Sequence, residues 1–316
     1  MHTLITGAAG FVGSALAWEL LSRAAPDDTF VLTDIAFDHA ISDARVNQIE
    51  GRLDDGATLT RILDGKPDRI FHLATVAGRQ SVDNFELGKS TNLDATIELL
   101  ERLRLQGNCP RVVYASSVAV FSPPWGSHVD DETLPNPGIS YATHKLIGEL
   151  LINDYTRAGF IDGVALRLSG IVARPAGSVT MLSAFLSDVF FSVAAGSPFT
   201  LPMAPESGTW VMSLKRCVEN LLHAGEVAAG DLPARRNWTL PALYLQMKDF
   251  VSALADYYGP QVYELVTCES VPQVEALFKQ CPLKAPGALQ LGFVGDGSVD
   301  EFVRNVILTN PQLAKR

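Results

Sequence analysis

The chain has 316 residues, of which 47% are hydrophobic and 19% are charged. It therefore carries enough apolar material for a folded core and is neither disordered nor fibrous, and its length fits two domains or one large α/β unit. Its formal net charge of −10 repels phosphate backbones and anionic lipids, so we expect no nucleic-acid or membrane partner.

Short apolar, β-rich runs alternate with helical patterns from the amino terminus to about residue 170. The expected strands cover residues 2–6, 30–33, 45–49, 69–74, 112–115 and 164–168. The expected helices among them cover about residues 12–23, 57–63, 86–106 and 140–157. Continuous apolar strands separated by helices indicate an α/β fold with a doubly wound parallel sheet of the Rossmann type.

The pattern becomes less regular after Gly170, where Pro- and Gly-containing loops join expected helices at residues 181–194, 213–224 and 246–258. This predicts a smaller, mixed carboxyl-terminal lobe. We expect residues 1–173 to form the first domain, with a strand near residues 236–241 returning to its sheet. Residues 174–316 then form mainly the second domain.

Four cysteines show neither CxxC spacing nor nearby pairs of histidines: Cys109, Cys217, Cys268 and Cys281. This predicts reduced thiols of a cytoplasmic protein and no metal site. The apolar amino-terminal segment has no cationic start and is interrupted by three glycines, so we expect neither a signal peptide nor a membrane helix.

The first expected strand leads into a glycine-rich turn, Thr6-Gly7-Ala8-Ala9-Gly10-Phe11-Val12-Gly13, and then into a helix. Glycines let the backbone approach a pyrophosphate closely, and the start of the helix stabilises the negative charge. The alternative is an ordinary strand-to-helix turn. Asp34 ends the second strand 21 positions after Gly13, where a carboxylate binds the adenosine ribose of a dinucleotide. Because no Arg or Lys adjoins Asp34, we expect NAD rather than NADP.

Tyr141 and Lys145 lie four residues apart on one face of an expected helix. A neighbouring ammonium stabilises a phenolate and lowers the pKa of tyrosine, so that Tyr141 can accept a hydroxyl proton while a hydride leaves for the cofactor. Ser117, just past a strand end, is placed to orient the reacting hydroxyl. The alternative for the Tyr-Lys spacing is a pair on a helix surface.

In this order, these motifs resemble the extended short-chain dehydrogenase/reductase family, which includes NAD-dependent epimerases and dehydratases. The TGxxGxxG motif is Thr6 to Gly13, the HLA segment is His72 to Ala74, and the active-site Ser, Tyr and Lys are Ser117, Tyr141 and Lys145. The resemblance implies that Asn92 assists catalysis by holding the active-site backbone. It implies NAD contacts from Gly7, Gly10, Phe11, Val12, Gly13, Asp34, Ile35, Leu53, Leu73, Ala74, Thr75, Asn92, Tyr141 and Lys145.

Two segments depart from the family pattern. After the third strand, Gly51-Arg52-Leu53 replaces a Gly-Asp-apolar segment; Leu53 can still pack on adenine, and Asp54 is the candidate for the missing carboxylate contact. After the sixth expected strand, Gly170 stands where nucleotide-sugar enzymes have an Asn that binds the substrate diphosphate. A glycine has no side chain for that contact, which argues against a nucleotide-sugar substrate.

The later segments 209–224, 237–243 and 291–307 resemble the D-erythronate dehydrogenase subgroup of the family. The resemblance implies oxidation of a four-carbon sugar acid with NAD, and a homodimer formed through the helices at 86–106 and 140–157. The expected substrate residues are Ser117, Tyr141, Arg174 and Thr180. Arg174 is the candidate for the substrate carboxylate, with a surface arginine as the alternative.

Three functions remain open at this point. The first is an NAD-dependent dehydrogenase of a small sugar acid with Tyr141 as general base. The second is a nucleotide-sugar epimerase or dehydratase that retains its NAD. The third is a dinucleotide-sensing module without chemistry, against which the intact Tyr141 and Lys145 pair argues.

Overall fold

The structure is a computed structural model that describes residues 1–174 and 182–315. The chain forms two compact units. Unit 1 consists of Met1–Pro123, Leu134–Leu168 and Val218–Thr239. Unit 2 consists of Pro124–Thr133, Ser169–Cys217 and Leu240–Arg316. Compared with the expected division at residue 173, Pro124–Thr133 and residues 169–173 belong to the second unit and Val218–Thr239 to the first, because the chain passes between the units several times.

Unit 1 contains one seven-stranded sheet in the order β10-β6-β5-β4-β1-β2-β3, in which every pair of neighbours is parallel. Its strands are β1 (His2–Thr6), β2 (Thr29–Asp34), β3 (Val46–Glu50), β4 (Arg69–His72), β5 (Arg111–Ser117), β6 (Asp162–Leu168) and β10 (Asn237–Thr239). The doubly wound sheet is therefore confirmed, and β10 pairs with β6 at its edge. The strand order reverses between β1 and β4, and ligands of such sheets bind at the carboxyl ends of the strands at that point.

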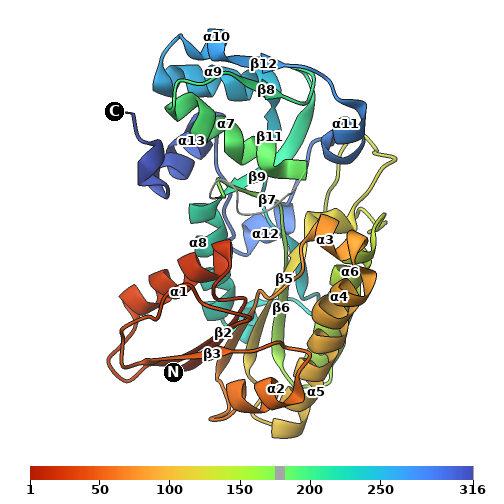
Figure 1. The fold of residues 1–316 in the computed structure, drawn as a ribbon. Helices are drawn as coiled ribbons and strands as arrows, with labels where there is room; N and C mark the ends of the chain where they lie inside the picture. Colours follow the sequence, from red (N-terminus) through yellow and green to blue (C-terminus); the bar gives the residue numbers. More distant parts are fainter. Residues whose placement is uncertain (175–181, 316) are drawn as a thin grey trace. The chain divides into compact units, whose positions relative to one another are not determined.

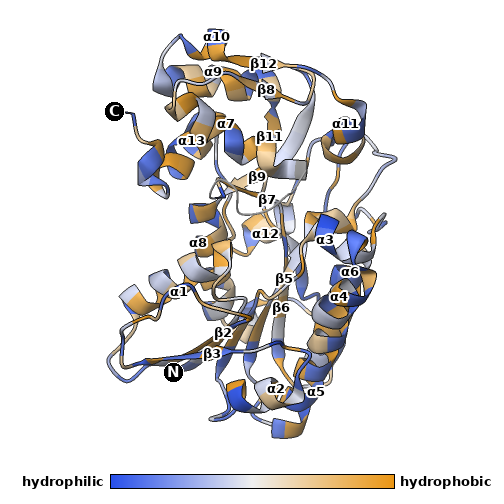
Figure 2. Cartoon of the chain, viewed as in Figure 1, coloured by the Kyte–Doolittle hydropathy of each residue, from blue (hydrophilic) through white to orange (hydrophobic). Residues whose placement is uncertain are grey.

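Helices cover both faces of this sheet (Figure 1). One layer contains α2 (Gly56–Ile62), α5 (Ala95–Gln106) and α6 (Ser140–Arg157), whose apolar residues form a core with alternate residues of the strands. The other layer contains α1 (Phe11–Arg23) and the end of α8 (Leu214–Glu226). Hydrophobic and hydrophilic stretches alternate along these helices, as expected of helices with one buried face (Figure 2).

The expected helix at residues 86–106 is helical throughout but is not one regular α-helix. It consists of α4 (Phe85–Lys89), the π-helical turn η1 (Ser90–Asp94) and α5. A further short helix, α3 (Gly78–Asp83), precedes it and was not expected. A single π-turn changes the hydrogen-bond spacing within a continuous helical stretch, and the sequence pattern does not distinguish it from α-helix.

Unit 2 contains two small sheets and several helices. The mixed sheet has the order β11 (Leu243–Gln246), β9 (Gly208–Ser213), β7 (Gly170–Val172), and the parallel pair is β12 (Val266–Cys268) with β8 (Phe199–Leu201). The helices that begin and end within it are α7 (Phe185–Ala194), α9 (Met247–Tyr258), α10 (Val262–Leu265), α11 (Pro272–Phe278), α12 (Pro286–Gln290) and α13 (Val299–Leu308).

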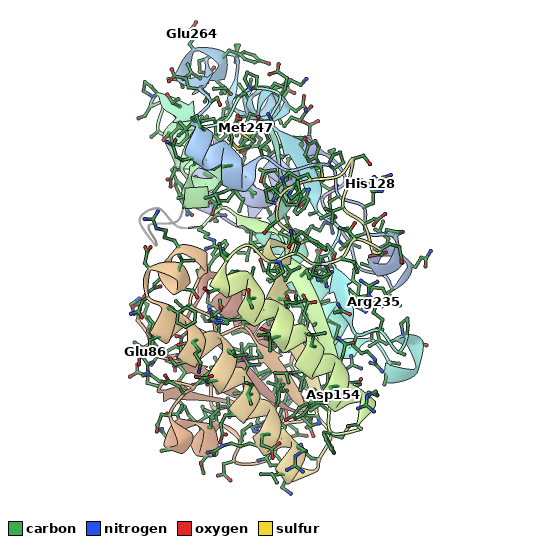
Figure 3. The ribbon with its side chains drawn as sticks, turned by 90° about the vertical axis from the view of Figure 1, so that its right-hand side faces the viewer. Glu86, His128, Asp154, Arg235, Met247 and Glu264 are labelled. Atoms are coloured by element: carbon green, nitrogen blue, oxygen red, sulfur yellow. The ribbon has the colours of Figure 1, made fainter. Side chains whose placement is uncertain are left out.

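Aromatic side chains of α7, α9 and α13 fill the core of unit 2. The rings of Phe190, Phe250 and Phe302 pack with centroids 5.4 to 6.3 Å apart. Met247 is buried beside them, whereas Glu264 lies at the edge of the unit (Figure 3). Among the residues that the structure describes, no helix is long and apolar enough to cross a membrane.

Candidate active site

The glycine-rich segment forms a tight turn between β1 and α1, at the reversal of strand order. Gly7 has a φ of 72°, and a Cβ on it would lie 2.7 Å from the backbone nitrogen of Ala74. A Cβ on Gly13 would lie 2.0 Å from the carbonyl oxygen of Gly7. These two positions therefore require glycine, and side chains there would fill the concave backbone surface. The turn and the start of α1 hold five of the expected cofactor residues: Gly7, Gly10, Phe11, Val12 and Gly13.

The start of α1 is suited to an anion. Its N-cap residue is Gly10, no side chain caps its first N–H groups, and its first turn contains no acidic residue. The N–H groups and the helix dipole at this end are thus available to a pyrophosphate. The backbone cradle and this helix end both fit NAD, the cofactor expected from the sequence.

Asp34 ends β2 beside the glycine turn. Its carboxylate accepts hydrogen bonds from the N–H of Ala9 at 2.9 Å and from the N–H of Ile35 at 2.7 Å. The carboxylate is therefore held at the strand ends, next to the turn where the dinucleotide is expected. Ile35 follows and is 73% exposed, an apolar residue that an adenine ring can cover.

In the segment after β3, Leu53 has surroundings different from those of its polar neighbours Arg52 and Asp54. Leu53 is buried in the core with α2 and β3. Both carboxylate oxygens of Asp54 accept hydrogen bonds from the guanidinium of Arg52, at 2.8 and 2.6 Å, and this contact holds the pKa of Asp54 below its usual value. Asp54 thus already has a cationic partner, and its contact to adenine stays a prediction.

A buried chain of hydrogen bonds joins the glycine turn to the helix that carries Asn92. The N–H of Ala74 donates to Thr6 Oγ1, which lies 2.8 Å from His72 Nδ1, and His72 Nε2 lies 3.0 Å from Thr96 Oγ1. The Thr96 hydroxyl donates to the carbonyl oxygen of Asn92. Burial lowers the pKa of His72 to about 3, so the ring is neutral. Because the Thr96 hydroxyl already donates its proton to Asn92, its oxygen accepts from His72 Nε2, which therefore carries the ring proton. Nδ1 then accepts a hydrogen bond from the Thr6 hydroxyl.

Asn92 lies in the π-turn η1 and is fully buried. Its Oδ1 accepts hydrogen bonds from the Thr75 hydroxyl at 3.0 Å and the N–H of Val76 at 2.7 Å, and its Nδ2 donates to the carbonyl oxygen of Val76 at 3.0 Å. The side chain therefore holds the backbone that follows β4. The other expected cofactor residues of this segment, Leu73, Ala74 and Thr75, lie in the same stretch.

Tyr141 and Lys145 lie on the first turns of α6, and Ser117 ends β5. The Lys145 Nζ donates to the carbonyl oxygen of Ala115 at 2.7 Å and lies 5.9 Å from the centre of the Tyr141 ring. Burial lowers the pKa of Lys145 to about 7, a shift that the Glu149 carboxylate opposes. The Ser117 Oγ accepts a hydrogen bond from the N–H of Ala119. Unit 1 thus brings all three expected residues to the carboxyl end of β5.

Tyr114 is a second tyrosine at this site that sequence reasoning missed. Its ring centre lies 5.0 Å from Lys145 Nζ, and its hydroxyl lies against Gly148, where a Cβ would approach it to 2.4 Å. Burial raises the pKa of Tyr114 well above its ordinary value, so its phenol stays protonated. Its position inside an apolar strand gave no signal of a site residue.

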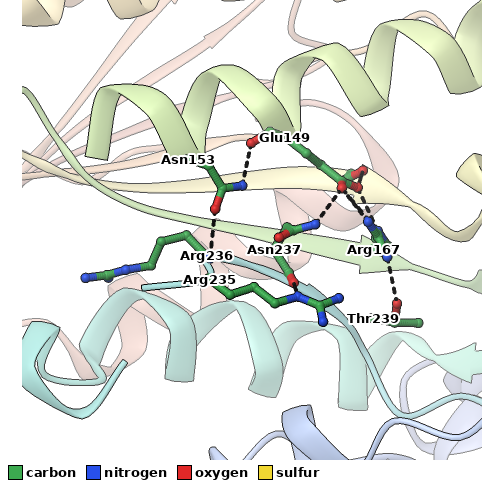
Figure 4. A network of polar contacts seen from close by, with 8 residues as sticks. Glu149, Asn153, Arg167, Arg235, Arg236, Asn237 and Thr239 are labelled. Carbon is green, nitrogen blue, oxygen red and sulfur yellow. Dashed lines mark hydrogen bonds and ion pairs between the residues drawn. The ribbon is translucent and has the colours of Figure 1, made fainter. Parts of the chain in front are cut away.

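Glu149 was also missed. It is fully buried one turn after Lys145, and Arg167 of β6 binds its carboxylate through Nε at 2.9 Å and Nη2 at 2.7 Å (Figure 4). Asn237 and Thr239 of β10 complete this network. The signal available in the sequence is an arginine inside the apolar strand VALRL, which requires a buried partner.

The expected substrate residues outside unit 1 are Arg174 and Thr180. Arg174 follows β7 in unit 2, is half-buried, and its N–H donates to Ser187 Oγ at 3.1 Å. Burial raises the pKa of the Cys217 thiol to about 12, and the positive charge of Arg174 opposes this rise. Thr180 lies outside the described residues.

Comparisons with known proteins give one family. A model of the NAD dependent epimerase/dehydratase family matches residues 3–203. D-erythronate dehydrogenase of Cupriavidus necator is 38% identical over 314 residues, which cover 96% of this chain and 97% of that protein. D-erythronate dehydrogenase of Haemophilus influenzae is 30% identical, with 97% of this chain and 99% of that protein covered.

Solved structures agree with the fold. A nucleoside-diphosphate-sugar epimerase from Agrobacterium tumefaciens superimposes with a TM-score of 0.93 and 29% identity, covering 98% of this chain and 94% of that chain. An L-threonine dehydrogenase from Cupriavidus necator reaches a TM-score of 0.85 at 18% identity, covering 98% and 99%, a likeness that concerns the fold alone.

Proposed function

Because the chain belongs to the NAD dependent epimerase/dehydratase family, we propose that it oxidises a secondary hydroxyl of a small sugar acid with NAD. D-erythronate, oxidised to 2-dehydro-D-erythronate, is the substrate we favour. The observation that supports it best is the likeness over nearly the whole chain to D-erythronate dehydrogenase of Cupriavidus necator. The half-buried Tyr141 beside the buried Lys145 supplies the chemistry that such a dehydrogenase needs.

Bound in this site, NAD would supply the acceptor for the hydride that leaves the carbon bearing the hydroxyl. Tyr141 accepts the hydroxyl proton, and the C–O bond becomes a carbonyl. The Lys145 ammonium favours the Tyr141 phenolate, and Ser117 donates a hydrogen bond to the reacting oxygen. Tyr114 is unsuited to this role, because burial keeps its phenol protonated.

The residues that would hold NAD follow from the family pattern and lie in unit 1. The backbone at Gly7, Gly10 and Gly13, with Phe11 and Val12, would bind the pyrophosphate at the start of α1. Asp34 would bind the adenosine ribose, and Ile35 and Leu53 would contact the adenine. Leu73, Ala74, Thr75 and Asn92 would line the middle of the site. Tyr141 and Lys145 would contact the nicotinamide ribose.

Arg174 and Thr180 are proposed to bind the substrate. A guanidinium forms two parallel hydrogen bonds with a carboxylate, which makes Arg174 suited to a sugar acid. Arg174→Met should raise KM for the acid far more than it lowers kcat, and an unchanged KM would remove Arg174 from the site.

A nucleotide-sugar epimerase is the second candidate, because the Agrobacterium structure of that description resembles this chain closely. Gly170 argues against it, since it lacks the side chain that would hold a diphosphate. The two functions differ in their cofactor balance: a dehydrogenase accumulates NADH with free sugar acids, whereas an epimerase shows no net reduction.

We also propose a homodimer in the cytoplasm. Exposed apolar side chains gather on α3, α4 and the start of α6, with Val82 47%, Phe85 57% and Ile139 37% exposed, around a groove. A second copy would cover these side chains. Light scattering would show twice the mass of the chain, and a monomer at assay concentration would contradict it. The four cysteines are free thiols, as in a reducing compartment.

Tyr141→Phe tests the proposed reaction. A screen of C3 to C6 sugar acids with NAD, read as NADH absorbance, should give activity in the wild type and at least a thousandfold less in this variant. Calorimetry should show NAD affinity largely retained. Tyr155→Phe, at the far end of the same helix, is the matched control and should stay active. Near-full activity of Tyr141→Phe would refute the proposed base.

A further inference from the structure

The Glu149 carboxylate joins α6 to three strands of unit 1. It accepts hydrogen bonds from Ser116 Oγ of β5 at 2.5 Å, from the Arg167 guanidinium of β6 and from Asn237 Nδ2 of β10 at 3.1 Å (Figure 4). Its exposed fraction is 0%, and that of Arg167 is 2%. A buried pair of charges is costly unless every oxygen and N–H has a partner, and here donors from three strands surround one carboxylate.

Glu149 and Lys145 hold consecutive residues of β5. The Lys145 Nζ donates to the carbonyl oxygen of Ala115, and Glu149 binds the hydroxyl of Ser116. The next residue is Ser117, and α6 also carries Tyr141. Two successive turns of α6 therefore fix the strand end that carries Ser117 against the helix that carries Tyr141.

Titratable groups surround Lys145 on each of the elements packed against it. Glu149 and Tyr141 lie on its own helix, Tyr114 on β5, and His72 on β4, both of these neutral because of burial. Arg167 of β6 binds Glu149 directly. On α4 and η1, Lys89 and Asp94 pair with each other and act on His144. Glu149 is thus the negative charge that favours the ammonium form of Lys145.

We propose that Glu149 is a positioning residue of this active site, which places a buried negative charge one helical turn from Lys145 and fixes Ser117 against Tyr141 through Ser116. The inference rests on the proposed dehydrogenase function for its catalytic consequence. Its electrostatic part concerns only residues of this chain and is measurable without substrate or NAD.

The first test is the titration of Lys145 by NMR in protein labelled with 13C at the lysine ε-carbons. Lys145 is identified by the signal that Lys145→Met removes. Glu149→Gln preserves the shape of the side chain and removes its charge, so the Lys145 titration should move down by about one pH unit. Asp154→Asn, on the exposed side of the same helix, should leave it unchanged. An unchanged titration in Glu149→Gln would overturn the electrostatic part.

Glu149→Gln leaves the Arg167 charge buried without a carboxylate, and the variant is at risk of misfolding. Glu149→Gln combined with Arg167→Met removes both charges, and Arg167→Met alone leaves the carboxylate. Lys145 should titrate near its wild-type pH in the double variant and higher in Arg167→Met. The same titration in both variants would overturn the proposal.

The second test is Ser116→Ala, which deletes one hydrogen bond and leaves no charge unpaired. It should lower kcat about tenfold while NAD affinity, measured by calorimetry, changes less than twofold and Lys145 titrates as in the wild type. Ser116→Thr restores the hydroxyl and should recover kcat. Full kcat in Ser116→Ala would overturn the positioning part. If no sugar acid is oxidised even by the wild type, the proposed function fails, whereas the Lys145 titration still decides the role of Glu149.

Discussion

Replacing Gly13 by alanine is expected to deform the glycine turn and to weaken NAD binding. The added Cβ would lie 2.0 Å from the Gly7 carbonyl oxygen and 2.9 Å from its carbon. Both are backbone atoms, so no side chain can rotate away, and the turn itself must open. The same Gly7 oxygen accepts the hydrogen bond from the N–H of Gly10, at 3.2 Å, which closes the turn.

Overpacking of this kind costs about 1–3 kcal/mol. If about 2 kcal/mol of that cost falls on the bound form, in which the turn must keep its shape, NAD affinity decreases about thirtyfold. Titration calorimetry with NAD measures the decrease, and urea unfolding reports any loss of stability in the free protein.

The matched control is Gly230→Ala. Gly230 lies in the 3₁₀ turn η4 (Ala229–Asp231), where an added Cβ meets no atom within 4 Å. This variant should bind NAD as the wild type does. Wild-type affinity in Gly13→Ala would refute the reasoning that this turn forms the pyrophosphate site.

Two further predictions concern buried groups beside the active site. Tyr114→Phe should raise the free energy of unfolding by about 1 kcal/mol in urea, because among the described residues its buried hydroxyl has no hydrogen-bond partner; a destabilised variant would reveal one. Lys145→Met should also raise the free energy of unfolding, and the increase should be larger at pH 6 than at pH 9. Burial lowers the pKa of Lys145 from 10.5 to about 7, so between these values the unfolded chain binds more protons and wild-type stability rises with pH. A gain that is equal at both pH values would contradict this.

The sheet of unit 1 could be predicted from sequence because its inner strands are buried on both faces. Strand β5 is an example, since Val112 to Ala115 are all buried and form a continuous apolar run. The strands of unit 2 gave no such signal. Three of them, β7, β8 and β12, have three residues each, too few for a period of two to be recognised.

The local motifs of the site could be predicted because they depend on residues close together in the sequence. Its tertiary contacts could not, because they join residues that only the fold brings together. The turn at Gly7 and Gly13 and the spacing of Tyr141 and Lys145 depend on neighbours in sequence. The pairing of Glu149 with Arg167, 18 residues apart, depends on α6 lying across β6. The sequence shows that a buried arginine needs a partner, but only the fold selects which carboxylate it meets.

The buried charges around Lys145 explain how an acidic protein can favour an anionic tyrosine. With Lys145 in its ammonium form, Lys145 and Arg167 are positive, Glu149 is negative, and His72 and Tyr114 are neutral, so the group then carries one net positive charge. In the proposed reaction a phenolate at Tyr141 brings the same group to zero. Because buried charges are poorly screened, this local sum outweighs the net charge of −10, which arises largely from exposed side chains in high dielectric. Arg167, which neutralises Glu149, is therefore required for the net positive charge of the group. With Lys145 and Glu149 alone, the site would already be neutral before the phenolate forms.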